Sequence, residues 1–221
     1  MAKMKNMLPI FPIPEIVMFP EMNLPLHIFE EKYKQLISDC LKSDKQFGIV
    51  LEKESNLCAK VGTLVEIVDV ENLEDGLMNI LTEGKNRFEI VSFLTEEPYY
   101  VAEIQSYEDT DTEIDTELKA SLKRIRQLAS KALKTFDLIS EEEHSRKIKL
   151  PNKPDELLFL IATNLTCPHE EKQFLLETRS IKDRAEKIIP LLDEELEKLK
   201  VLLENKNTKN DVAKNGKLKI H

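Results

Sequence analysis

At 221 residues, with 41% hydrophobic residues, the chain can form one large domain or two small ones with a core. Its formal net charge of −9 repels phosphate backbones, so nucleic acid is not expected as a partner. The sequence has no apolar run of about 18 residues and no signal-peptide cleavage pattern, so we expect neither a membrane span nor secretion. Three widely spaced cysteines, Cys40, Cys58 and Cys167, are typical of free thiols in the cytoplasm.

Residues 8–30 form a proline-rich apolar segment that contains five of the ten prolines of the chain. Proline fixes φ and donates no backbone hydrogen bond, so neither a helix interior nor a long central strand is expected here. The pattern instead predicts short strands at residues 8–11 and 16–19, separated by rigid corners.

An amphipathic helix and a series of strands are predicted next. Apolar residues at three- and four-residue steps predict the helix at about residues 30–42. Runs rich in Val, Ile and Leu, separated by turn residues, predict a twisted sheet or partial barrel. These runs cover residues 47–51, 61–70, 78–82, 87–94 and 99–107, with turns expected at 72–76 and 83–85.

The second half of the chain predicts helices. After an acidic connector at residues 108–115, helical periodicity covers residues 114–136, 155–165, 168–178 and 181 onward. Pro190 is expected to end or kink the last helix. Residues 205–221 carry five lysines and one aspartate and are expected to be a disordered basic tail. The predicted organisation is a β-rich lobe (7–108), a helical subdomain (114–204) and this tail.

Several blocks of sequence resemble a known family. The order LP-x-FP-x-P-x-x-V-x-FP followed by LPLHIFE, at residues 8–30, resembles the start of the N-terminal, substrate-binding domain of the ATP-dependent protease Lon. Blocks such as DG-x-x-N-I-L (75–81) and EG-x-x-RFEI (83–90) extend the resemblance over roughly residues 7–204. It implies an α+β fold, with a PUA-like twisted sheet or pseudo-barrel followed by an α-helical subdomain. Glu21 stands where the family usually has glycine, so a different local turn is expected.

The sequence offers no catalytic or metal motif. The histidines are dispersed, and Cys167 with His169 gives only two of the four ligands of a structural zinc site. A phosphate-binding loop is missing, and the Ser–Lys dyad of Lon lies in a module that this resemblance does not include. We therefore expect no catalysis, no cofactor and no metal. For Arg87, pairing with a local carboxylate or carbonyl is favoured over anion binding.

The resemblance implies binding of unfolded or exposed polypeptide segments, linked to proteolysis and protein quality control. Met18, Met22, Tyr99 and Tyr100 are the candidate contact residues, with core packing as the alternative for each. The alternative function is an adaptor or assembly subunit with one fixed folded partner, such as a protease. Weak homo-oligomerisation and a small-molecule site stay open, and RNA binding is a weaker third hypothesis because the body is acidic.

Overall fold

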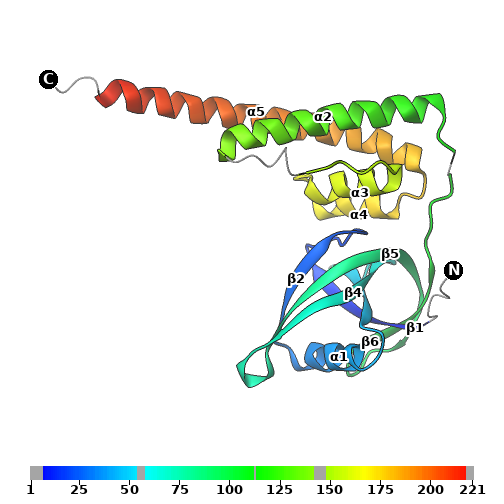
Figure 1. Ribbon diagram of the computed structural model, residues 1–221. Coiled ribbons are helices and arrows are strands. Elements are labelled where there is room, and N and C mark those ends of the chain that lie inside the picture. The colour runs from blue at the N-terminus through cyan, green and yellow to red at the C-terminus, as the bar shows by residue number, and fades with distance from the viewer. Residues whose placement is uncertain (1–6, 54–57, 112, 142–147, 218–221) are drawn as a thin grey trace. The chain divides into compact units, whose positions relative to one another are not determined.

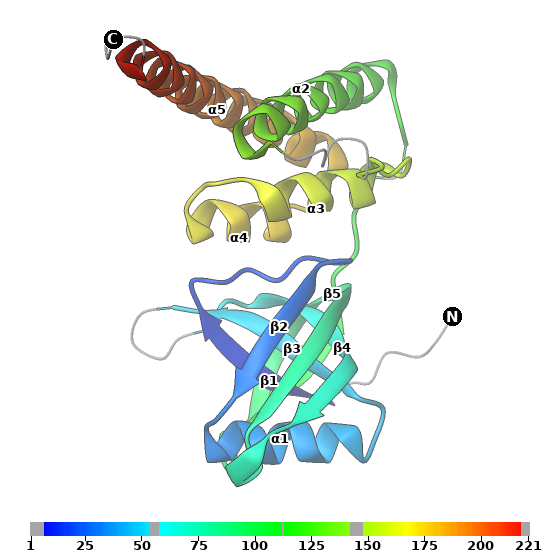
Figure 2. The same ribbon diagram turned by 60° about the vertical axis from the view of Figure 1, so that its left-hand side comes forward.

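The computed structural model describes residues 7–53, 58–111, 113–141 and 148–217 (Figures 1 and 2). The chain forms two compact units, which we call the β unit and the helical unit. The β unit comprises Met1–Thr112 and Ala162–Ile181, and the helical unit comprises Glu113–Ile161 and Lys182–His221. The sequence assigned residues 162–181 to the helical subdomain, whereas here they group with the strands because one helix packs on the barrel.

The β unit is built on a six-stranded mixed sheet with the order β2-β5-β4-β3-β1-β6. Because β5 also pairs with β6, five strands close into a barrel and β2 extends it beside β5. This confirms the predicted α+β class with a barrel-like lobe. The strands are β1 (Met7–Pro14), β2 (Asn23–Ile28), β3 (Gln46–Glu52), β4 (Val61–Asn72), β5 (Met78–Thr95) and β6 (Tyr100–Ser106).

Strand β1 accommodates three prolines because its two neighbours pair with different halves of it. Residues 7–10 pair with antiparallel β6, and residues 10–14 pair with parallel β3. Apart from Ile10, each residue of β1 pairs with one neighbouring strand only. A proline, which has no backbone N–H, can therefore stand in β1 without breaking a hydrogen bond between strands. The expectation that this segment avoids a longer central strand was wrong for this reason.

The segment at residues 16–19 is a loop, and the strand expected there was wrong. Its carbonyls bond across the barrel: Thr63 Oγ1 donates to Met18 O at 2.6 Å. A Cβ added at Gly84 would lie 2.2 Å from Phe19 O, so glycine is needed for this close approach. The turn predicted at residues 83–85 was also wrong, because β5 runs continuously through Gly84.

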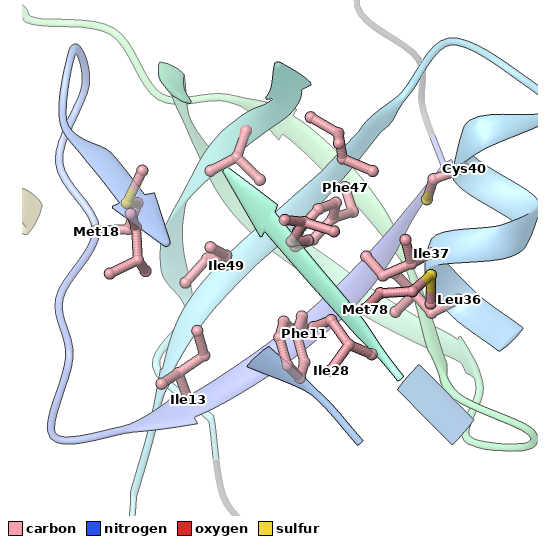
Figure 3. Packing of buried hydrophobic residues seen from close by; sticks show 14 residues of the cluster. Phe11, Ile13, Met18, Ile28, Leu36, Ile37, Cys40, Phe47, Ile49 and Met78 are labelled. Atoms are coloured by element: carbon pink, nitrogen blue, oxygen red, sulfur yellow. The ribbon is translucent and has the colours of Figure 1, made fainter. Parts of the chain in front are cut away.

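A large apolar cluster fills one side of the barrel (Figure 3). Helix α1 (Glu31–Leu41) contributes Leu36, Ile37 and Cys40, which point toward the strands. Cys40 is buried and its thiol donates to Gln46 O at 3.4 Å, as expected for a packed cysteine. In the same unit, α4 (His169–Glu177) lies at the opposite end of the barrel from α1 (Figures 1 and 2).

The helical unit contains α2 (Thr116–Ser140), most of α3 (Pro154–Asn164) and α5 (Ile181–Lys217). Helices α2 and α5 lie side by side and parallel, since Glu117 pairs with Lys182 at 2.5 Å and Arg124 with Asp193 at 2.6 Å (Figure 1). Pro190 lies inside α5, which does not end there. The α5 backbone continues to Lys217. Among the described residues, no helix is long and apolar enough to cross a membrane.

Tyr99, immediately before β6, links the barrel to α1. Its hydroxyl donates to Asp39 Oδ2 at 3.0 Å. Burial, together with the hydrogen bond to Asp39 and the negative charge of that carboxylate, raises the pKa of Tyr99 to about 12. The hydroxyl of Tyr99 therefore stays protonated in the folded β unit and can donate its hydrogen bond to Asp39.

We predict that Glu21→Gly stabilises the protein. Glu21 has a φ of 62°, a left-handed conformation that costs a residue with a side chain about 1–2 kcal/mol. Glycine removes this strain, but its greater freedom in the unfolded chain destabilises the folded state by about 0.4–1 kcal/mol. The free energy of unfolding should therefore rise by about 0.5–1 kcal/mol. Urea denaturation measures the change. Glu21→Ala, which removes the carboxylate near Lys85 but keeps the strain, should give no gain; an equal gain would contradict the backbone explanation.

We also predict that Tyr99→Phe changes the alkaline limb of the stability profile. The unfolded tyrosine ionises near pH 10 and the folded one near pH 12, so the stabilisation is complete below about pH 10. It is then lost as the pH rises through about 12. The variant should lose about 1 kcal/mol near neutral pH, and its deficit relative to wild type should shrink above about pH 10. Denaturation midpoints across this range test this. A deficit that stays constant would show that Tyr99 does not titrate as described.

Candidate functional site

The β unit contains an open groove of about 860 Å³. One wall comes from the ends of β1 and β3, which run parallel with Pro14 opposite Glu52. Because the carboxyl ends of parallel strands meet at the same edge, Glu15 and Lys53 are brought to this rim together with Leu51. Residues about 40 positions apart in the sequence thus form one surface.

The other wall of the groove is one face of α4. Its lining residues recur at helical spacing, which places their side chains on the same side of the helix. They are His169, Glu170, Gln173, Phe174 and Glu177. Phe174 is 53% exposed, so the groove presents an aromatic ring to its surroundings.

Helix α4 is fixed to the barrel by side-chain hydrogen bonds to backbone carbonyls. Gln173 Nε2 donates to Val61 O at 3.0 Å, and Tyr107 Oη donates to Glu177 O at 2.8 Å. Arg87 Nη1 donates to Leu176 O at 2.6 Å and to Thr178 O at 3.1 Å. Helix α4 is therefore held by partners from β4, β5 and the segment after β6.

Arg87 has the structural role that the sequence favoured. Its side chain is buried and forms a salt bridge from Nη2 to Asp109 Oδ1 at 2.5 Å. The guanidinium also lies over the Tyr107 ring, 5.3 Å from its centroid. With these partners and two carbonyls, Arg87 serves packing within the unit, and it does not line the groove.

The groove combines apolar surface with negative charge. Pro14, Leu51 and Phe174 supply the apolar part. Four carboxylates, two of them on the strand side and two on α4, face two basic side chains, Lys53 and His169. No serine, threonine or cysteine is among the described lining residues.

The four candidate contact residues of the sequence do not gather in this groove. Met18 is only 2% exposed and belongs to the core, so its expected place in a surface patch was wrong (Figure 3). Met22 and Tyr99 are half-buried and pack against the same core cluster. Tyr100 is half-buried beside the second cluster, with its ring 5.4 Å from that of Phe93. Core packing, the alternative for each residue, explains these positions.

An exposed apolar patch lies near Tyr100, at the end of β5. We call Val91, Phe93 and Leu94 the hairpin patch; they are 55%, 42% and 51% exposed. The pairing with β6 shifts register at Val91 and again at Leu94, so each is an extra, bulged residue. These shifts change which side chains face the core. They were not visible in the sequence, which suggested one plain strand.

The histidines and cysteines show no metal arrangement in the described part of the chain. Within that part, no three or more His, Cys, Asp or Glu side chains are placed to hold a metal ion. His27 Nδ1 is 2.8 Å from Asn79 Oδ1, in keeping with a hydrogen-bonded structural histidine. His144 and His221 lie outside the described residues.

The groove residues were missed by sequence reasoning. The five α4 positions follow a helical period and were open to detection, although polar residues on a helix usually face solvent. The strand-side residues gave no signal, because the parallel pairing of β1 with β3 joins segments that are distant in sequence.

Comparisons with known proteins agree on one family. A family model described as the ATP-dependent protease La (LON) substrate-binding domain matches residues 7–194. Lon protease of Syntrophus aciditrophicus is 30% identical over 209 residues, which cover 90% of this chain and 26% of that protein. Lon protease of Dictyoglomus thermophilum is 28% identical over 219 residues, covering 96% and 27%. The chain thus spans about a quarter of the length of these curated relatives.

Solved structures show the same fold. The N-terminal domain of a Mycobacterium avium complex Lon protease aligns with a TM-score of 0.68 and 17% identity, covering 85% of this chain and 98% of that one. A Lon N-terminal domain protein from Xanthomonas campestris aligns with a TM-score of 0.63 and 22% identity, covering 83% and 97%. With the family model matched over residues 7–194, the chain belongs to the Lon substrate-binding domain family.

Proposed function

We propose that this chain binds unfolded polypeptide segments without catalysing a reaction on them, and that the α4 groove is the binding surface. The observation that carries the proposal is an open groove with an exposed aromatic ring and a polar rim in a member of a substrate-binding family. Ligand sites combine an apolar surface with a few fixed polar groups in the same way.

The groove is largely preformed, which favours binding of a flexible polypeptide segment. Its walls are the ends of two paired strands and one face of a helix, all fixed by hydrogen bonds within the β unit. A largely preformed surface of this kind pays little ordering cost on binding. Binding would deliver segments to proteolysis and so serve protein quality control. Proteolysis itself lies outside this proposal, because the matched family model is that of the substrate-binding domain.

The proposed setting of this activity is the cytoplasm. All three cysteines are free thiols in the structure, and such cysteines are typical of reducing compartments. We propose neither nucleic acid nor a membrane as a partner, because the chain carries a net charge of −9, which phosphate-rich surfaces repel. Weak self-association stays a proposal that sedimentation would test.

We predict that Phe174→Ser weakens binding of an unfolded protein such as reduced, carboxymethylated casein. Removing an aromatic ring that covers bound apolar side chains should raise Kd about tenfold, the effect of losing about 1–2 kcal/mol of apolar contact. Fluorescence anisotropy of labelled casein measures this. Leu138→Ser is the matched control, because Leu138 is 62% exposed but lies on α2 in the helical unit. Equal weakening by both variants, or by neither, would remove the groove from the proposal.

The hairpin patch favours a second candidate function, an adaptor that contacts one folded partner. An exposed apolar patch on paired strands is a common feature of protein interfaces.

We predict that Val91→Ser with Phe93→Ser separates the two functions. If the adaptor function holds, these changes abolish capture of one stoichiometric partner from lysate, and excess casein does not compete for that partner. Casein binding should be unchanged, within about twofold, because the patch residues do not line the groove. Loss of casein binding in this variant, with the fold retained by circular dichroism, would instead assign polypeptide binding to the hairpin patch.

A further inference from the structure

We propose that the α4 groove selects polypeptide segments in which a lysine or arginine stands next to an apolar residue. This rests on the proposed function and specifies its substrate class. The inference joins three independent features of the groove: its excess of carboxylates, a buried side-chain acceptor without a partner, and an exposed aromatic ring.

The first feature is the charge of the lining. Four glutamates face one lysine and one histidine, and His169 Nε2 already lies 3.0 Å from Glu170 Oε1. Among the described residues, Glu15 and Glu52 form no ion pair, although the pairing of β1 with β3 brings their segments together at the rim. Two carboxylates without an ion-pair partner among the described residues favour a cationic ligand and repel an acidic one.

The second feature is Gln173, which is more than nine-tenths buried at the groove. Both of its donations are used: Nε2 bonds to Val61 O at 3.0 Å and to Glu177 Oε1 at 2.8 Å. These bonds fix the orientation of the amide and leave Oε1 as a buried acceptor that receives no hydrogen bond from the described residues. An N–H donor of a ligand that entered beside Gln173 would satisfy this acceptor. Arginine and lysine carry such donors, whereas a carboxylate side chain has no donor.

The third feature is Phe174, one residue from Gln173 and four from Glu170, on the same face of α4. An aromatic ring accepts both a neighbouring apolar side chain and the aliphatic stem of lysine or arginine, and it attracts their charged groups. With carboxylates at the rim and a ring beside them, the groove is complementary to a cationic residue followed by an apolar one. An all-apolar segment meets only part of this surface.

Matched peptides test the selection. Three short fluorescent peptides share the same apolar residues and differ in whether the neighbouring positions hold Lys and Arg, Gln, or Glu. The basic peptide should bind the full chain about fivefold more tightly than the Gln peptide, and the Glu peptide should bind most weakly. The preference should fall as salt shortens the screening length from about 10 Å at 0.1 M to about 3 Å at 1 M.

Charge variants place the effect in the groove. Glu15→Gln with Glu52→Gln should remove most of the preference for the basic peptide and leave the Gln peptide unchanged within about twofold. Glu74→Gln with Glu96→Gln is the control, because it changes the net charge equally at exposed positions outside the groove. The control variant should keep the preference. Thermal denaturation of both variants confirms that each is folded.

The outcomes distinguish this inference from the function on which it rests. Equal binding of all three peptides would overturn the charge selection and leave polypeptide binding standing. Equal loss of preference in both variants would assign it to net charge, and so overturn the groove as its origin. If none of the peptides binds, and casein does not bind either, both the selection and the proposed function are wrong.

Discussion

The structure of the β unit depends on the buried guanidinium of Arg87. From β5 it reaches two carbonyls at the end of α4 and the carboxylate of Asp109, so it joins three segments that are distant in sequence. A cation at a helix C-terminus is favoured by the helix dipole, and removing one partner of a buried pair typically costs about 3–5 kcal/mol. The groove exists only because α4 is held in this place.

A second constraint is the close approach of backbones inside the barrel. A Cβ at Gly62 would lie 2.4 Å from Ile49 O, and one at Gly84 would lie 2.2 Å from Phe19 O. Together with a proline-bearing strand whose two ladders are staggered, these positions let the strands close into a barrel. The barrel then brings the carboxyl ends of β1 and β3 together, and these ends form the wall opposite α4.

The β unit has two exposed apolar surfaces, which are built in different ways. The groove has two walls and charged residues at its rim, which suits a flexible chain that must be oriented as it binds. The hairpin patch arises from two bulges that turn apolar side chains outward, which suits a preformed protein surface. The two surfaces share no residue, so the two proposed functions do not compete for the same side chains.

The sequence by itself determined the family, the α+β class, the positions of α1 and the four later helices, the packed position of Cys40 and the pairing of Arg87 with a carboxylate or carbonyl. It could do so because periodicity and motif order are local properties of the chain. Only the tertiary structure decided that β5 passes through Gly84, that Met18 is buried, and that residues 162–181 join the barrel. It alone assembled the groove, because parallel pairing and packing on Arg87 bring together residues whose separation in sequence carries no signal.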